Sequence, residues 1–447
     1  MSEDTAELTL PCVVVQPGDP DYAETSRTFA AQGTPDLIVR PADAQEVSAA
    51  VRYAITHGHT LTVRSGGHSM AGFSTGHDGM VVDLRRLDGV ELVDAEQRRV
   101  RVGAGATWGT VAGALRPHGL ALTAGDTTSV GVSGLTLGGG IGWMVRRYGL
   151  AIDNLVGARI VTADGSILRA SAAENPDLFW AIRGGGGNVG VVVDLDFVAQ
   201  PVETVVFGTI TYELRDVAAL LRGWRDHMRA APDELTTSLA VLPATGGAGP
   251  TAMLTCCYVG DEATSSAVLG PLADLAPVVD SSVTTHPYAD ILLDGHEPPE
   301  GIRAGVTNAM VPELDDAMIT TIAQVLEAHP GAALELRSLG GAVARVPADA
   351  TAFAHRDAEA MVVVVIMMPA DMPDRALDEA LAPWKAISRG LGAYVNFLGT
   401  AAEDDVAAVY PEAIRARLAA LKRRYDPENV FRRTHNVVPA RDEEPAG

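Results

Sequence analysis

The chain has 447 residues, of which 34 are Lys or Arg and 57 are Asp or Glu, so its formal net charge is −23 at pH 7. This charge disfavours nucleic acids and anionic membranes as partners, because both bind clustered basic residues. The acidic N-terminus lacks the basic region of a signal peptide, the longest apolar run is too short to span a membrane, and the three cysteines form no disulfide or zinc pattern, so we expect a cytoplasmic protein.

Helix and strand signals alternate over the first part of the chain. Asp43 followed by Glu46 is a capping-box pattern, and the apolar spacing after it predicts a helix that ends at Gly58. Thr107 is placed to cap a second helix. Strands are predicted at residues 61–64, 80–84, 100–102, 158–161, 167–170 and 191–197, with an Asp-Gly hairpin turn at 164–165 and a short helix at 174–183.

The character of the sequence changes near Pro201. Glycine-rich loops become fewer, and longer strand patterns alternate with amphipathic helices, an order that predicts an antiparallel sheet covered by helices in a separate domain. The tail carries a further helix, with Pro411 in its first turn and an apolar stripe that ends at Tyr425. The strands are predicted at 205–212, 251–259, 333–339 and 361–368, and the helices at 312–329 and 375–391.

Residues 64–69 (Arg-Ser-Gly-Gly-His-Ser) form the first candidate for a ligand site. Adjacent glycines after a strand allow positive φ, and the backbone N–H groups of such a turn bind anions. Arg64 would add a charge for a phosphate. The alternative interpretation is a solvated turn that contains an incidental histidine.

Two further segments are rich in glycine. Residues 125–142 hold seven glycines interleaved with Val, Leu and Ile, which favours a backbone pressed against a flat cofactor; an apolar packing segment is the alternative. Gly185, Gly187 and Gly190 match the spacing G-x-G-x-x-G. Here, however, the predicted helix precedes the glycines and the strand follows them, which is the reverse of a dinucleotide-binding unit. A nicotinamide-dependent dehydrogenase is therefore disfavoured.

Tyr394 and Asn396 alternate with apolar residues, which predicts that both lie on one face of a strand, where they would address a ligand. A half-buried edge strand is the alternative. Glu335 and Arg337 share a predicted strand face and are expected to pair. The arginines at 146–147 are expected to be a solvated pair unless a pyrophosphate lies near them. No metal site is expected, because the remaining candidates lack ligand spacing: His286, His296 and Glu297.

Together these motifs resemble the FAD-dependent oxidoreductases of the berberine bridge enzyme-like group, within the vanillyl-alcohol oxidase type. The resemblance covers about residues 38–439 and is most specific at 64–69 and 130–140; it continues through 146–150, 153–154, 177–184 and 425–431. It implies a two-lobed α+β fold. The implied parts are a PCMH-type FAD-binding domain at 1–203, an antiparallel-sheet substrate domain covered by helices at 204–390, and a C-terminal segment at 391–447 that completes the FAD lobe.

In that group the histidine of the first glycine turn is bonded to the flavin 8α carbon, so the resemblance implies FAD linked covalently through His68. Many members add a second tether through a cysteine, and Thr127 stands at that position here, which implies a single link. The residues implied to bind FAD are Arg64, Ser65, Gly66, Gly67, His68, Ser69, Gly125, Thr128, Gly131, Val132, Gly134, Gly139, Gly140, Gly142, Asn154, Gly190, Val192, Tyr394, Asn396 and Asn436.

The resemblance also implies a reaction: hydride transfer from a small alcohol, sugar or amine to flavin N5, with molecular oxygen or another electron acceptor as the second partner. Tyr394 matches a tyrosine that acts as the general base in related oxidases. Arg345 stands where plant alkaloid members carry a catalytic glutamate, and there it would dock an anionic substrate, with Tyr394 as the other substrate residue; a structural arginine is the alternative. The alternative is a catalytically silent flavin- or ligand-binding protein of the same fold.

Overall fold

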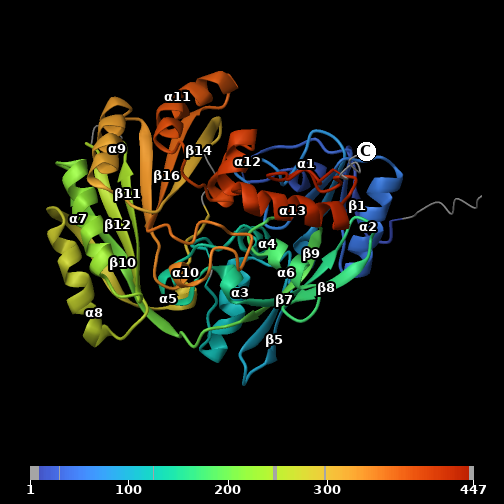
Figure 1. Cartoon of the computed structure of the whole chain (residues 1–447), viewed down its shortest axis with the longest axis horizontal. Coiled ribbons are helices and arrows are strands. Elements are labelled where there is room, and N and C mark those ends of the chain that lie inside the picture. The colour runs from blue at the N-terminus through green and yellow to red at the C-terminus, as the bar shows by residue number, and fades with distance from the viewer. Residues whose placement is uncertain (1–9, 30, 124, 245–248, 296–298, 442–447) are drawn as a thin grey trace, which may run out of the picture.

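Three β-sheets divide between two lobes in the structure, a computed structural model of the chain (Figure 1). It describes residues 10–29, 31–123, 125–244, 249–295 and 299–441. The first lobe holds two sheets and the second lobe holds the third, so the molecule has a two-lobed α+β fold.

The first lobe pairs a four-stranded sheet, in the order β1-β2-β4-β3, with a five-stranded antiparallel sheet, in the order β5-β6-β9-β7-β8. Helix α2 (Ala44–Thr56) packs between them, because its buried apolar residues contact strands of both sheets. The strands are β1 (Val13–Val15), β2 (Leu37–Arg40), β3 (Leu61–Arg64), β4 (Met80–Asp83), β5 (Val90–Asp94), β6 (Arg99–Gly103), β7 (Leu155–Val161), β8 (Ile167–Ser171) and β9 (Val191–Val198). The other helices are α1 (Tyr22–Thr25), α3 (Trp108–Leu115), α4 (Val132–Leu137), α5 (Val145–Tyr148) and α6 (Pro176–Ile182).

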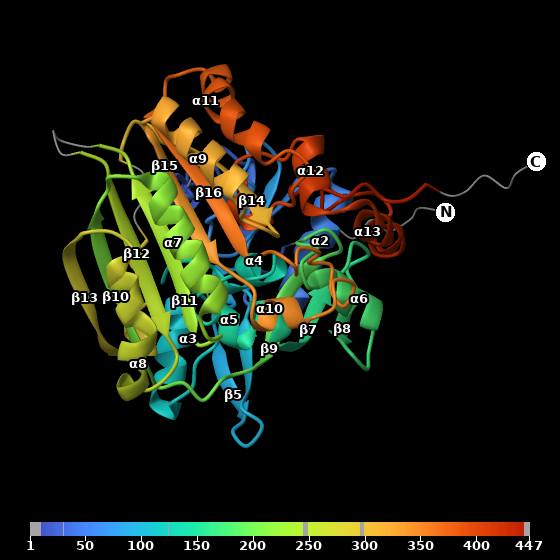
Figure 2. The same cartoon turned by 60° about the vertical axis from the view of Figure 1, so that its left-hand side comes forward.

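The second lobe is a seven-stranded antiparallel sheet in the order β13-β10-β12-β11-β15-β16-β14. All but the shortest of its helices lie along one face, and the other face is turned toward the first lobe (Figure 2); the shortest helix, α10 (Ala342–Arg345), packs instead against α5. The strands are β10 (Thr204–Glu213), β11 (Leu235–Leu242), β12 (Thr251–Tyr258), β13 (Val278–Pro287), β14 (Ile302–Val311), β15 (Ala332–Ser338) and β16 (Ala360–Pro369). The helices are α7 (Val217–Ala230), α8 (Glu262–Leu269), α9 (Asp316–Ala328), α10 (Ala342–Arg345) and α11 (Asp374–Ile387).

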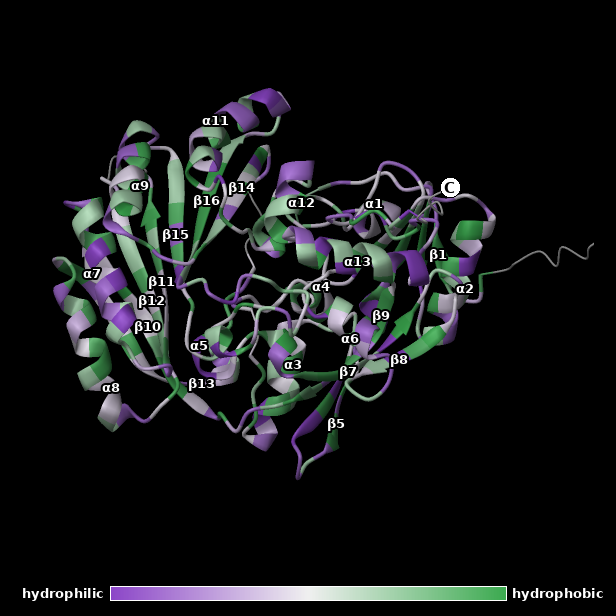
Figure 3. Cartoon of the chain, viewed as in Figure 1, coloured by the Kyte–Doolittle hydropathy of each residue, from purple (hydrophilic) through white to green (hydrophobic). Residues whose placement is uncertain are grey.

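The pairing register gives the two faces of this sheet different side chains. Leu239 is opposite Leu336, and both lie in the apolar core under the helices. Ser238 is opposite Arg337 and therefore points to the other face, toward the first lobe. In Figure 3, α7 carries both hydrophilic and hydrophobic residues, whereas β16 is largely hydrophobic.

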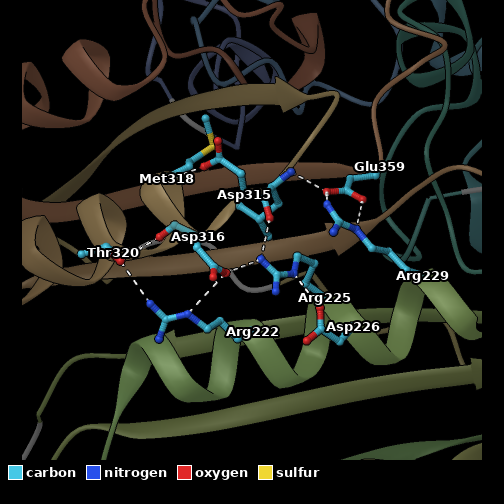
Figure 4. A network of polar contacts seen from close by, with 10 residues as sticks. Arg222, Arg225, Asp226, Arg229, Asp315, Asp316, Met318, Thr320 and Glu359 are labelled. Carbon is cyan, nitrogen blue, oxygen red and sulfur yellow. Dashed lines mark hydrogen bonds and ion pairs between the residues drawn. The ribbon is translucent and has the colours of Figure 1, made fainter.

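Polar contacts tie α7 to its neighbours (Figure 4). Arg225 Nη1 lies 2.7 Å from Asp316 Oδ1 at the start of α9, and Arg229 donates two hydrogen bonds of 2.8 Å to Glu359. Since Asp316 and Arg229 are both substantially exposed, these pairs fix the helix packing at a modest gain in stability.

The C-terminal segment returns to the first lobe, where α12 (Glu403–Val409) and α13 (Glu412–Tyr425) pack (Figure 1). Lys422 on α13 is fully buried and donates to the main-chain oxygens of Asn188, at 3.0 Å, and Phe431, at 2.8 Å. The tail is therefore fastened to the glycine loop that contains Asn188.

Most predicted elements are confirmed. Asp43 accepts the backbone N–H groups of Gln45 and Glu46 at the start of α2, and the 164–165 turn joins the antiparallel strands β7 and β8. Helix α9 begins at Asp316, later than predicted, because Asp315 caps it by accepting the Met318 N–H. Pro411 precedes α13 as its N-cap.

The prediction that the arginines at 146–147 are solvated is wrong for Arg146. Its buried guanidinium donates to the main-chain oxygens of Leu339, at 2.7 Å, and Ala231, at 3.1 Å, and so joins the two lobes. Among the described residues, the structure holds no helix that is long and apolar enough to cross a membrane.

Candidate active site

A cavity of about 770 Å³ opens between the glycine segments of the first lobe and the sheet of the second. Small-molecule sites generally occupy about 300–1,000 Å³. The wall combines segments that are far apart in the chain. The sequence-predicted residues that line it are Ser65, Gly66, Gly67, His68, Ser69, Gly125, Gly131, Gly134, Gly190, Val192, Tyr394 and Asn396.

His68 reaches the cavity from the turn that follows β3. Gly67 has φ +80°, which glycine adopts without strain. The imidazole stacks on Phe29 with the ring centroids 4.6 Å apart, and Ser65 Oγ donates to the main-chain oxygen of Ala104 at 2.7 Å. These contacts hold the turn, and with it the His68 ring, at the cavity wall.

Arg64 does not line the cavity, contrary to the predicted phosphate contact. Its side chain is 1% exposed and its Nη2 lies 3.1 Å from Asp83 Oδ2. Arg64 and Asp83 are paired residues of the parallel strands β3 and β4, so the guanidinium has a carboxylate partner within the sheet. The ion pair anchors the base of the His68 turn.

Gly134 and Gly187 leave open space along the wall. A Cβ atom at either position would meet no protein atom within 4 Å, and neither residue has positive φ. Gly134 lies inside helix α4, where glycine costs about 0.5–1 kcal/mol relative to alanine. Since neither packing nor backbone geometry requires glycine there, we infer that the space admits a ligand close to the backbone.

The tail supplies wall residues that the sequence reasoning missed: Arg433, Thr434 and His435. These three residues follow the 425–431 motif. Because the C-terminal segment is expected to complete the first lobe, the position shortly after that motif could have indicated them. Asn436, predicted to bind the cofactor, is not among the lining residues, but its Oδ1 is buried without a hydrogen-bond partner in the described part of the chain. Such an atom is suited to accept a hydrogen bond from a ligand or a water.

Tyr394 and Asn396 meet at the wall, but the predicted strand is wrong. Val395–Phe397 form a 3-10 turn, because the Asn308 side chain forms hydrogen bonds with the main-chain groups at the two ends of this turn. Asn308 Oδ1 accepts the Tyr394 N–H at 2.7 Å, and its Nδ2 donates to the main-chain oxygens of Tyr394 and Phe397. The turn brings the two predicted side chains together.

The phenol oxygen of Tyr394 accepts three N–H groups: from Gly140 at 3.0 Å, from Ile141 at 3.3 Å and from Asn396 Nδ2 at 2.8 Å. Burial raises the pKa of Tyr394 and outweighs these donors, which act in the opposite direction. The resting side chain is therefore a neutral phenol that fastens the tail to the glycine segment.

A charged cluster borders the second-lobe side of the cavity. Arg337 Nη2 lies 2.6 Å from Asp126 Oδ2, and its Nε donates to Glu335 Oε1 at 2.8 Å, which confirms the expected Glu335–Arg337 pair. Burial alone would raise the pKa of Asp126, but the guanidinium and the Thr127 hydroxyl together hold it below its usual value. Asp126 and Arg337 both line the cavity, and the prediction did not bring them together.

The comparisons with known proteins identify the family. A family model described as "FAD binding domain" matches residues 35–171, and one described as "Berberine and berberine like" matches residues 393–438. (R)-6-hydroxynicotine oxidase of Paenarthrobacter nicotinovorans is 31% identical, over 91% of each chain. The chain belongs to the berberine bridge enzyme-like FAD-linked oxidoreductases.

Two further relatives agree with this assignment. Xylooligosaccharide oxidase of Thermothelomyces thermophilus is 31% identical over 91% of this chain and 88% of its own. The crystal structure of 6-hydroxy-D-nicotine oxidase from Arthrobacter nicotinovorans superposes with a TM-score of 0.87 at 28% identity, over 98% of this chain and all of that one. The fold and the enzyme class of this FAD-linked oxidoreductase follow from these similarities.

The residues present fit FAD. The open space at Gly134 and Gly187 admits a bulky group against the backbone, and the cavity runs from the tail to the second-lobe sheet. The unpartnered Asn436 Oδ1 lies next to this wall in sequence. An extended cofactor with polar and flat parts is the kind of ligand that such a wall accommodates.

Several predicted residues lie away from the cavity of this oxidoreductase. Arg345, expected to contact substrate, does not line the cavity: its Nη1 lies 2.6 Å from Asp233 Oδ2, and α10 packs against α5. Gly139 and Gly140 are instead close to Tyr394, Phe353 and Ala151, behind the wall. The others that do not line it are Thr128, Val132, Gly142 and Asn154.

No group of three metal-ligating side chains occurs among the described residues. His286 is within 2.8 Å of the Thr284 hydroxyl on β13. His296 and Glu297 lie outside the described residues.

Proposed function

We propose that this oxidoreductase carries FAD bonded through the 8α carbon to His68 and oxidises a small alcohol, sugar or amine. The observation that carries the proposal is the position of His68, which lines the same cavity as Gly134, Gly187 and the Tyr394–Asn396 pair. Thr127 stands where many members have a second, cysteine tether, so we propose a single covalent link.

In this proposal, residues 1–203 and 391–447 hold the cofactor and residues 204–390 border the substrate. The turn at 65–69 and the glycines of the wall would hold FAD, and Arg433 would contribute a positive charge. Bound FAD supplies an acceptor for the hydride that leaves a substrate C–H bond. The second-lobe sheet excludes water and orients the substrate, and oxygen or another acceptor takes up the electrons.

Tyr394 remains the proposed site for a proton that an alcohol must lose, because this residue lines the cavity. Its raised pKa means that it would have to receive that proton as it passes its own proton on to water. The relatives' names refer to 6-hydroxynicotine and to xylo-oligosaccharides, so substrates of both the amine and the sugar type fit the family.

Acid precipitation of the purified holoenzyme tests the covalent link. We expect the yellow colour to stay with the precipitated protein, and His68→Ala to release it into the supernatant. Flavin that leaves the unaltered protein in acid, or a covalent adduct that persists in His68→Ala, would contradict the assignment. Reduction by dithionite but by no alcohol, sugar or amine under anaerobic conditions would favour the silent flavin-binding alternative.

A further inference from the structure

The second-lobe border of the cavity is apolar. Ala304 on β14 is opposite Met367 on β16, and Val306 is opposite Val365, so these four side chains share one face of the sheet. All four line the cavity. A polyhydroxylated molecule placed against this face would leave hydroxyl groups without hydrogen-bond partners, whereas an apolar body would not.

The adjoining border carries an excess of negative charge. Asp126 and Asp294 line the cavity, and Arg337 pairs with Asp126 and with Glu335, so this border holds three carboxylates and one guanidinium. The other arginine of the described lining, Arg433, is at the first-lobe end, 3.6 Å from Asp78. A cation in the second-lobe half is therefore stabilised and an anion is repelled. The net charge of −23 acts on approaching molecules in the same sense.

The third observation concerns proton removal. The phenol oxygen of Tyr394 is occupied by the N–H groups of Gly140, Ile141 and Asn396. Loss of hydride from an alcohol carbon also requires loss of the hydroxyl proton. For a neutral amine, the C–H bond breaks, the hydride leaves with its two electrons to the oxidant, FAD, and the nitrogen lone pair closes a C=N bond, so no proton has to leave in that step.

We propose that the substrate is an amine with an apolar body, which the carboxylates attract as its ammonium ion and which reacts after it has lost one proton to water. This inference rests on the proposed function and narrows its substrate class. The apolar face of β14 and β16 receives the body, and the Asp126–Arg337–Glu335 cluster with Asp294 favours the charged nitrogen.

Binding of matched probes to the flavin-loaded holoenzyme tests this proposal without requiring turnover. Benzylamine, benzyl alcohol and benzoate share one apolar body and differ in charge, and xylobiose serves as a sugar probe. In titration calorimetry at pH 7 and low salt, we expect benzylamine to bind at least tenfold more tightly than each of the other three. Asp294→Asn should weaken benzylamine binding about threefold or more and leave benzyl alcohol binding unchanged. Asp378→Asn on the outer helix α11 is the matched control and should change neither.

Benzoate or xylobiose binding as tightly as benzylamine would overturn the proposal, as would binding of none of the four probes. An Asp294→Asn variant that retains the full preference for benzylamine would also overturn it. Failure of the proposed function is separable, because it is measured by the flavin that acid leaves on the protein. A holoenzyme that keeps its flavin in acid but prefers benzoate contradicts this inference alone.

Discussion

Asn396 Nδ2 donates to the Tyr394 phenol oxygen at 2.8 Å and also to the main-chain oxygen of Leu135 at 3.0 Å. Leu135 belongs to α4, whose Gly134 opens onto the cavity. One amide side chain thus links the C-terminal segment to the helix that carries the glycine wall. The family's Tyr-x-Asn pair is, in this chain, a structural link as well as a candidate for chemistry.

Tyr394→Phe separates these two roles. The variant leaves the N–H groups of Gly140 and Ile141 without their acceptor, so we expect the free energy of unfolding to fall by about 1–3 kcal/mol. Urea unfolding followed by circular dichroism measures this loss. If Tyr394 acts only as a structural link, the rate of flavin reduction at saturating substrate should change less than about tenfold. A rate loss of about 10²–10⁴-fold in the folded variant would show that it acts as a general base.

Gly134→Ala tests whether the space at α4 belongs to the cofactor. Alanine is the better helix former by about 0.5–1 kcal/mol and meets no protein atom within 4 Å, so the flavin-free protein should become slightly more stable. The flavin bound per protein, read from absorbance, should fall at the same time.

Gly113→Ala is the matched control for Gly134→Ala. Gly113 lies in helix α3, also has open space around its Cα and is not part of the cavity wall. It should raise stability by a similar amount and leave the flavin content unchanged. Equal flavin content in both variants would show that the room at Gly134 is not used by the cofactor.

The parts of the site that could be predicted are those in which residue type itself is informative. The density of glycines indicates a ligand site at 125–142, and a histidine between small residues indicates one at the turn after β3. Few constraints other than close approach of a ligand to the backbone produce such patterns. The reversed order of α6 and β9 around the third glycine loop could also be predicted from periodicity.

The remainder depends on contacts between distant segments. Arg337 finds Asp126 only when the second-lobe sheet docks on the glycine segment. The turn at 395–397 forms because Asn308, on β14, takes the main-chain hydrogen bonds that a strand partner would have made. The resemblance to the family predicts that Arg345 contacts the substrate. Its ion-pair partner Asp233 lies in a loop whose position in space the hydrophobic pattern of the sequence does not predict.

Acidification should destabilise the protein through buried histidines. Burial lowers the pKa of His355, so the folded ring stays neutral to a lower pH than in the unfolded chain, where the pKa is about 6.5. Below that pH the unfolded state binds a proton that the folded state does not, and the free energy of unfolding falls as the pH drops from 7 toward 5. Unfolding in urea at several pH values measures the slope, which should be smaller in His355→Gln. An equal slope in that variant would exclude His355 as a contributor.

Lys422 is expected to be essential for the tail that completes the cavity. Its ammonium group lies 3.1 Å from Asp426 Oδ2, and both side chains are fully buried. Lys422→Met leaves the carboxylate without its counter-charge, so we expect a loss of about 3–5 kcal/mol in the free energy of unfolding. Because Arg433 and His435 follow this anchor and line the cavity, flavin content should fall as well.

Arg375→Met provides the control, since Arg375 pairs with Glu379 at the same i,i+4 spacing but on the exposed surface of α11. That variant should lose only about 0.3–0.5 kcal/mol and keep its flavin. Both quantities come from urea unfolding and from flavin absorbance per protein. A Lys422→Met variant as stable as Arg375→Met would mean that the buried pair is not what holds the tail. The hydrogen bonds that the Val430 and Phe431 N–H groups donate to Asp426 would then be sufficient.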